Sequence, residues 1–204
     1  MFLRILAVHN RPSVKKRKKT FEKMQTFKIS DAIDAKEFKY PVVIGLTGPK
    51  GVGKTTLAHR IGGSLISFST PIKKMLEVIV PKINIYEEKE TQLPGFPEGV
   101  NARRLLQSLG TEFGRNHYPD IWVNFVEEKI AEEVDIWEHN QVYREFPLRI
   151  IIDDVRFRNE AEMIHRHKGE VWRLKRKGVE YLEDHVSERA LPDEIIDKEI
   201  IADE

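Results

Sequence analysis

The chain has 204 residues, of which 40% are hydrophobic and 33% are charged, and this is typical of one soluble globular domain with room for an appendage. No apolar run approaches the length of a membrane span, and the segment 2–8 is too short for a secretory signal, so we expect a cytoplasmic protein without a membrane partner. The absence of cysteine excludes disulfides, thiolate metal sites and a cysteine nucleophile.

Charge is distributed unevenly along the chain. Residues 1–39 hold eleven Lys and Arg against four Asp and Glu, a balance of +7, so the total of +1 leaves −6 for residues 40–204. We expect residues 1–39, with the run Lys15–Lys19, to be a basic and flexible extension; a nucleic-acid-binding or targeting tail is the alternative. Residues 40–204 are expected to form the folded domain, and their negative balance argues against nucleic-acid binding outside the extension.

Apolar runs alternate with amphipathic segments from Tyr40 onward. Strands are predicted at 42–47, 64–69, 148–153, 170–175 and 198–202, and helices at 54–61, 71–80, 102–109, 121–134 and 159–167. Residues 81–100 are rich in proline, glycine and acidic side chains and are predicted to be a loop or a mobile sub-domain. Because strands alternate with helices, we predict an α/β fold in three layers, with a parallel central sheet covered on both faces.

A glycine-rich segment lies between the first of these strands and the helix that follows it. Gly48–Thr55 matches the pattern G-x-x-x-x-G-K-[ST] in full. Its glycines would let backbone N–H groups turn inward around a phosphate, towards which the next helix directs its positive end. We therefore predict a P-loop NTPase sandwich with helical substrate-binding and lid insertions. It would bind ATP and Mg²⁺ through Gly48, Lys50, Gly51, Val52, Gly53, Lys54, Thr55 and Thr56, with Lys54 on the β- and γ-phosphates and the Thr55 hydroxyl on the metal.

Two aspartates follow the most hydrophobic predicted strand. P-loop enzymes need a carboxylate at the end of a neighbouring strand to hold the metal or its waters. Adjacent strand residues point to opposite faces, so one of Asp153 and Asp154 is expected to face the metal. We favour Asp154, and the alternative is that both only cap the next loop. Arg156 would share the face of Asp154 and either pair with it or bind a substrate phosphate.

Five segments, in order, resemble the phage-type deoxynucleoside monophosphate kinases. They are Gly48–Thr55, Phe68–Lys73, Arg103–Arg115 (RRLLQSLGTEFGR), Asp154–Glu160 (DVRFRNE) and His185–Glu188 (HVSE). The third and fourth segments are far more specific than the glycine-rich pattern, which indicates a superfamily. The chain departs from the family at Asp153, where a Pro or a small residue is common, and near Ala202, where an Asn is expected.

The resemblance implies transfer of the γ-phosphoryl of ATP to a deoxynucleoside 5′-monophosphate, by a homodimer that works in the host cytoplasm if a phage encodes it. Residues Arg103, Gln107, Thr111 and Arg115 lie four apart and would share one helix face towards the acceptor; a solvated face with ordinary ion pairs is the alternative. Trp122 would either stack on the base or pack in the core. The substrate-binding set is Lys73, Arg103, Gln107, Thr111, Glu112, Arg115, Trp122 and Arg156.

Catalysis is expected to depend on charge stabilisation rather than on a general base. The expected catalytic residues are Lys54, Asp154, Arg156 and Arg115. Arg176 matches a lid arginine of the family and would bind the nucleotide, unless the basic run 173–177 is only the outward side of a strand. Two other functions remain open: a small-metabolite kinase such as phosphomevalonate kinase, and a nucleic-acid-associated P-loop ATPase anchored by the extension.

Overall fold

The computed structural model describes residues 3–7, 42–80, 84–85, 89–141, 143, 146–181 and 185–202. The chain divides into two compact units. Unit 1 comprises Met1–Leu65 and Ile130–Glu204, and unit 2 is the segment Ile66–Lys129 between them. Helix α5 (Ile121–His139) begins in unit 2 and ends in unit 1.

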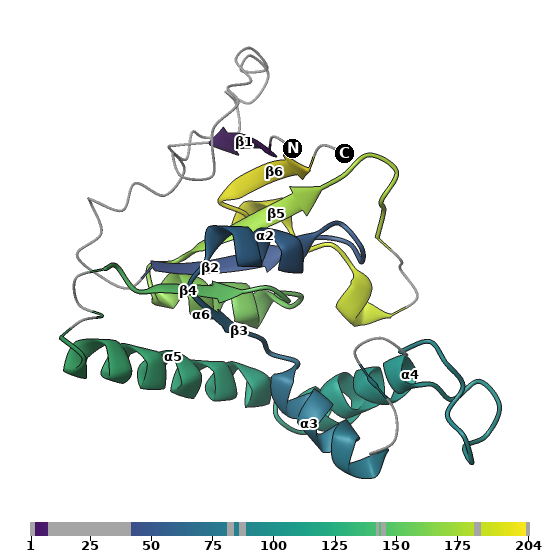
Figure 1. The fold of residues 1–204 in the computed structure, drawn as a ribbon. Coiled ribbons are helices and arrows are strands. Elements are labelled where there is room, and N and C mark those ends of the chain that lie inside the picture. The colour runs from purple at the N-terminus through teal and green to yellow at the C-terminus, as the bar shows by residue number, and fades with distance from the viewer. Residues whose placement is uncertain are drawn as a thin grey trace. The chain divides into compact units, whose positions relative to one another are not determined.

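Unit 1 is built on a six-stranded sheet with the spatial order β1-β6-β5-β2-β4-β3 (Figure 1). β2 pairs in parallel with β4 and β5, and β5 pairs in parallel with β6, while β1 joins the edge antiparallel to β6. The predicted α/β fold with a parallel central sheet is therefore confirmed. The strands are β1 (Leu3–Ala7), β2 (Val42–Thr47), β3 (Ser64–Ile66), β4 (Arg149–Ile152), β5 (Glu170–Lys175) and β6 (Lys198–Ala202).

Two helices cover opposite faces of the sheet beside β2 (Figure 1). Ile44 and Leu46 belong to the apolar cluster that includes three buried residues of α2 (Lys54–Ile61). On the other face, α6 (Arg158–Arg166) packs so closely that a Cβ on Gly45 would lie 2.3 Å from the Cδ1 atom of Ile164. Because both faces are covered, β2 and β4 are apolar almost throughout, as parallel strands in such folds are.

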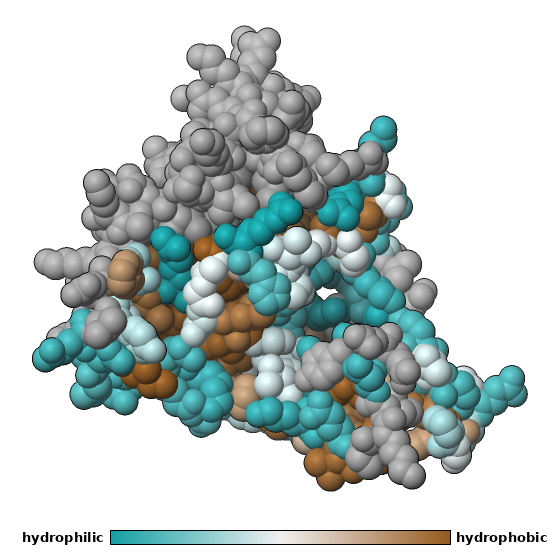
Figure 2. All heavy atoms as spheres, viewed as in Figure 1, coloured by the Kyte–Doolittle hydropathy of each residue, from teal (hydrophilic) through white to brown (hydrophobic). Residues whose placement is uncertain are grey.

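Unit 2 is helical and has its own apolar core. It contains α3 (Thr70–Ile79), α4 (Ala102–Gln107) and the π-helix η2 (Ser108–Arg115), which continues α4. The Oδ1 atom of Asn101 accepts a hydrogen bond of 2.9 Å from the N–H of Arg104 and so caps α4. Its core residues are Leu76, Val80, Ile85, Leu93 and Ala102. Apolar residues also reach the surface at the end of α3, where Val78 is 82% exposed (Figure 2).

Most predicted elements are present, but several bounds differ; α5, for example, extends five residues beyond the predicted 121–134. β3 ends at Ile66, and the hydroxyls of Ser67 and Ser69 lie 2.8 Å apart in the turn that follows. The π-helix extends the predicted helix 102–109 to Arg115. Strand β1 was not predicted and lies within the expected extension 1–39; residues 8–41 of the chain, with the basic run Lys15–Lys19, lie outside the described residues. In the described part, none of the helices has the length and apolar character needed to span a membrane.

Candidate functional site

Three neighbouring parallel strands of unit 1 bring the predicted donor-site residues to one edge of the sheet. β4, β2 and β5 lie side by side in parallel, so their carboxyl ends meet at the same edge. The glycine-rich segment Gly48–Thr55 follows β2 and leads into α2, whereas Asp153 follows β4 and Arg176 follows β5. Ligands of open α/β sheets bind at this edge.

The loop of residues 48–53, which we term the glycine loop, requires glycine at its first position. Gly48 has a φ of +143°, and a Cβ there would lie 2.6 Å from the carbonyl oxygen of Leu174. Val52 is fully buried and ties the loop to the core of unit 1. The loop conformation is therefore fixed by packing on β5 as well as by its own sequence.

We expect Gly48→Ala to lower the free energy of unfolding by about 2–3 kcal/mol, because the new Cβ meets a backbone atom and adopts a strained φ. Gly51→Ala is the matched control: its φ is +77°, but no atom lies within 4 Å of the added Cβ, so strain alone should cost about 1 kcal/mol. Urea unfolding measures both. Equal losses would contradict the close packing of Gly48 on β5.

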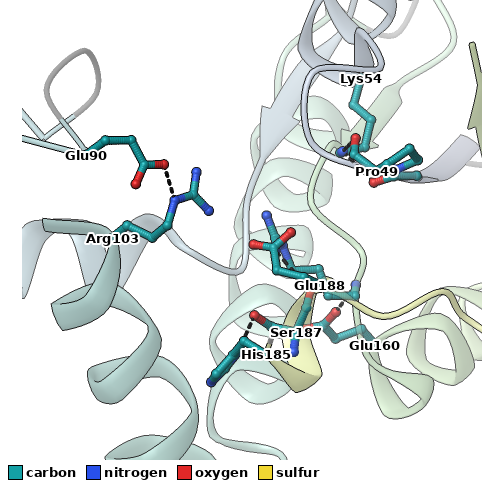
Figure 3. Close-up of polar contacts among 10 residues, drawn as sticks. Pro49, Lys54, Glu90, Arg103, Glu160, His185, Ser187 and Glu188 are labelled. Carbon is teal, nitrogen blue, oxygen red and sulfur yellow. Dashed lines mark hydrogen bonds and ion pairs between the residues drawn. The ribbon is translucent and has the colours of Figure 1, made fainter. Parts of the chain in front are cut away.

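Lys54 lies at the first position of α2 and is directed at the glycine loop (Figure 3). Its Nζ atom donates hydrogen bonds of 2.7 Å to Gly48 O and 2.9 Å to Pro49 O. Burial, and then repulsion by Arg156, lower the pKa of Lys54 from 10.5 to about 8, against the attraction of three nearby carboxylates. A partly desolvated ammonium beside backbone N–H groups is suited to binding an anion.

A hydrogen bond joins the end of the glycine loop to the end of β4. The Oγ1 atom of Thr55 donates to Asp153 Oδ2 at 2.8 Å, although 98 residues separate them. A threonine hydroxyl next to a carboxylate provides two oxygen atoms of the kind that Mg²⁺ prefers. Asp154 is half-buried and acts on Lys54 by its charge, but less strongly than Asp153.

Arg156 is held by the turn of residues 186–188. Its Nη1 atom donates to Glu188 Oε1 at 2.8 Å and to Ser187 O at 2.9 Å. Burial lowers the pKa of Arg156, but the charge and hydrogen bond of Glu188, together with the charges of Asp154 and Glu160, outweigh burial, so this pKa lies above its ordinary value. The sequence suggested that Arg156 could pair with Asp154. In the structure its main partner is Glu188, and Asp154 adds only a weaker attraction.

Backbone capping fixes the segment that carries Arg156. Glu160 is 2% exposed, and its Oε2 atom accepts from the N–H of Arg156 at 2.6 Å and of Phe157 at 2.9 Å. In the facing turn, the Nδ1 atom of His185 accepts from the N–H of Ser187 at 3.2 Å (Figure 3). The sequence analysis assigned no functional role to three of these residues, Glu160, His185 and Glu188. All three lie in segments that resemble the family.

Arg176 also lies beside the glycine loop. Its Nη2 atom is 3.4 Å from the position that a Cβ on Gly53 would occupy. Unit 1 thus brings together Lys54, Thr55, Asp153, Arg156 and Arg176 around the start of α2. Lys50 and Thr56 are exposed at the same loop and helix end.

Apart from Arg156, the predicted acceptor residues belong to unit 2, where they have different partners. Arg103 pairs with Glu90 through its Nε atom (Figure 3), while Arg115 Nη1 donates to Pro119 O at 3.1 Å. Ser108 donates to Glu112 Oε2 at 2.6 Å, and both line an apolar hollow of about 450 Å³ with Leu76, Ile79, Phe96, Leu105, Leu109, Phe113 and His117. Lys73 is half-buried on α3, as Gln107 and Thr111 are on α4 and η2.

Trp122 is part of the packed interior of unit 2. It is 5% exposed, and its Nε1 atom donates to Gly110 O at 2.7 Å. A Cβ on Gly114 would lie 2.5 Å from the indole ring, so the ring packs directly on the π-helix. The position favours the alternative in which Trp122 packs in the core, where its N–H helps to fix the turns of η2.

We expect Trp122→Phe to lower the free energy of unfolding by about 1–3 kcal/mol, because the carbonyl of Gly110 loses a buried donor. Trp137→Phe is the matched control: this indole also donates to backbone carbonyls, at 2.9 Å, but at an exposed site, so its loss should cost less. Chemical unfolding followed by circular dichroism measures both. A larger loss for Trp137→Phe would contradict the role given to Trp122.

Comparison with known proteins shows the family of the chain. A protein of Acanthamoeba polyphaga mimivirus, named "Putative deoxynucleotide monophosphate kinase", is 31% identical to the chain over 160 residues, which cover 72% of this chain and 80% of the mimivirus protein. No protein-family model matches the chain. An identity of this level over most of both chains shows the family: the chain belongs to the deoxynucleotide monophosphate kinases.

Proposed function

We propose that the protein transfers the γ-phosphoryl group of ATP to a deoxynucleoside 5′-monophosphate, with Mg²⁺ as cofactor. The hydrogen bond between Thr55 and Asp153 carries the donor half of the proposal, since it brings a hydroxyl and a carboxylate together at the N-terminus of α2, beside Lys54. The acceptor half rests on membership of the family and on the resemblance of Arg103–Arg115.

The glycine loop would hold the triphosphate. Backbone N–H groups of the loop and of the first turn of α2 are directed at an anion in this arrangement. Lys54 donates to two backbone carbonyls, and a bound phosphate would replace these acceptors and attract the ammonium more strongly. No covalent step by the protein is needed, because the reaction depends on alignment and on neutralising charge.

Asp153 and Thr55 fit a divalent cation, since both offer oxygen ligands. The sequence favoured Asp154, whereas the contact of Asp153 with Thr55 supports Asp153 as the residue that holds Mg²⁺ or its waters. When bound, the ion would neutralise part of the charge on the β- and γ-phosphates. Asp154 would then act at longer range, on the charges of Lys54 and Arg156.

Arginines would stabilise the transferring phosphoryl group. Arg156 and Arg176 lie in unit 1 near the glycine loop, and we propose that they neutralise charge on the phosphates. Arg103, Gln107, Thr111 and Arg115 of unit 2 would bind the acceptor, as the family resemblance implies. The acceptor phosphate is an anion near neutral pH, so no strong base is required.

A panel of acceptors tests the function. The full chain is incubated with ATP, Mg²⁺ and, in turn, each of the four deoxynucleoside monophosphates, their ribonucleotide counterparts and phosphomevalonate, and the release of ADP is measured. We expect turnover with at least one deoxynucleotide. Turnover with phosphomevalonate alone, or ATP hydrolysis that requires DNA or RNA, would contradict the proposal. Light scattering of the same sample tests the homodimer that the resemblance implies.

The lowered pKa of Lys54 predicts the pH dependence of nucleotide binding. Below about pH 8 the free protein already carries the ammonium, whereas above it Lys54 is neutral and must take up a proton when phosphate binds. The affinity for MgATP should therefore fall as pH rises from 8 to 9, by up to about tenfold. Calorimetry at pH 7, 8 and 9 measures this, and Lys54→Met should bind more weakly, with no such dependence. A constant affinity in the wild type would contradict the assignment.

A further inference from the structure

A turn far along the chain determines where the Arg156 guanidinium lies. The segment Val186–Glu188 is a short 3-10 helix, and it provides both acceptors of Arg156 Nη1: the carboxylate of Glu188 and the carbonyl of Ser187. The side chain of Glu188 is 10% exposed, whereas that of Arg156 is 36% exposed. The anion of this pair is thus enclosed, while part of the cation remains open.

The enclosed carboxylate constrains where the guanidinium lies. A buried carboxylate without its partner is unfavourable, so Glu188 holds the guanidinium firmly. The turn itself is anchored, because the N–H of Glu188 donates to His185 O at 2.8 Å and His185 accepts from Ser187. From the other side, Glu160 fixes the backbone of Arg156. The arginine is therefore constrained at its backbone and at one Nη atom.

Glu188 also acts on the glycine loop. Its charge attracts Lys54 more strongly than that of Asp153 or Asp154 does, and Arg156 repels Lys54. The pair of Glu188 and Arg156 thus lies close enough to Lys54 to influence it electrostatically. Glu188 therefore contacts one cation of the proposed phosphate site and attracts the other.

We propose that Glu188 is a positioning residue: its enclosed carboxylate holds the Arg156 guanidinium at the glycine loop, oriented for the transferring phosphoryl group. The proposal rests on the proposed kinase function for its catalytic consequence. Glu188 also attracts Lys54, but its carboxylate is bonded to Arg156, so most of its effect on kcat should vanish when Arg156 is removed. Pre-positioning of this kind reduces the reorganisation needed during phosphoryl transfer.

A double-mutant cycle tests this dependence. Glu188→Gln keeps the size of the side chain and removes its charge; we expect kcat to fall about 10–100-fold, with the KM for ATP changed less than about twofold. Arg156→Ala should lower kcat at least as much, and the double variant should be no slower than Arg156→Ala alone. Effects that multiply, or a kcat unchanged by Glu188→Gln, would overturn the proposal.

Glu162→Gln is the matched control. Glu162 accepts from Arg158 at 2.9 Å, a pair of similar length in the same unit, but both side chains are about half exposed. Exposed pairs contribute little, so kcat should not change. If Glu188→Gln does not fold, as judged by circular dichroism, Glu188→Asp takes its place: it keeps the charge but shortens the reach, and we expect an intermediate kcat at near wild-type stability.

A second measurement separates this proposal from the kinase function. In ¹⁵N-labelled protein, a guanidinium held by Glu188 should give resolved Nη–H signals, identified by their absence in Arg156→Lys. These signals should persist in Glu162→Gln and disappear in Glu188→Gln. Their persistence in Glu188→Gln would overturn the positioning role, whatever the activity. If the wild-type chain gave these signals but no turnover in the acceptor panel, the result would contradict only the proposed kinase function.

Discussion

Lys54→Met is expected to lower kcat for phosphoryl transfer by about 10²–10³-fold while the fold stays intact. The Nζ atom of Lys54 contacts the glycine loop backbone directly, at the carbonyls of residues 48 and 49. In a site of low dielectric, a preorganised charge that meets developing negative charge contributes several kcal/mol to the transition state. Methionine keeps a side chain of similar length without the charge, so the loss reports on electrostatics rather than on packing.

Steady-state kinetics and a circular dichroism spectrum check this result together. Lys74→Met is the control, because Lys74 is exposed on α3 of unit 2 and the same change of charge there should leave kcat within about twofold. Removing a partly buried charge should not lower the stability of the free protein, since the desolvated ammonium is itself unfavourable there. A variant that is folded and as active as the wild type would contradict the assignment of the loop.

The part of the site that could be predicted is the part encoded locally. The glycine loop is a continuous segment in which each residue type has a conformational or electrostatic reason, and β2 and α2 on either side follow from the periodicity of apolar residues. Gly48 shows the limit of such reasoning, because its contact with Leu174 O comes from a strand more than one hundred residues away. The pattern indicated a glycine but not the packing that requires it.

The choice between Asp153 and Asp154 could not be made from the sequence for a physical reason. Alternation of side chains applies only within a strand, and β4 ends at Ile152, before both aspartates. Their directions are therefore set by the turn that follows, in which the N–H of Val155 donates to Leu46 O at 3.1 Å. Tertiary contacts of this kind leave no periodic signal.

Two other features were missed because they depend on distant pairing. Strand β1 has five residues and forms through its antiparallel register with β6, in which Ile5 lies opposite Ile200 near the other end of the chain. Glu188 is 32 residues from Arg156, and an HVSE segment gives no local indication of an arginine partner. The segments of family resemblance include both Arg156 and Glu188, but the contact between these residues is seen only in the folded chain.

Asp153→Asn is expected to have the second largest effect, a fall in kcat/KM of about 10²-fold at low Mg²⁺ that is partly recovered at high Mg²⁺. The carboxylate accepts a hydrogen bond of 2.8 Å from the hydroxyl of Thr55. Removing its charge should therefore weaken the binding of a cation that is held by both oxygens. Asparagine keeps the shape and one oxygen, which leaves room for the partial recovery. The value of kcat/KM for ATP is measured against Mg²⁺ concentration, from rates at ATP concentrations below KM.

Asp154→Asn separates the two aspartates under the same conditions. The charge of Asp154 acts on Lys54 and Arg156 from a half-buried position, where screening weakens it. We expect a fall of less than about tenfold and an unchanged Mg²⁺ concentration at half-maximal rate. If Asp154→Asn instead raised the Mg²⁺ requirement and Asp153→Asn did not, the metal would belong to Asp154 and the hydrogen bond from Thr55 would serve only to close the loop.

Variants of Thr55 give an independent measure of the metal site. Thr55→Ser keeps the hydroxyl and should match the wild type. Thr55→Val should show the same Mg²⁺ requirement as the Asn variant of whichever aspartate holds the ion.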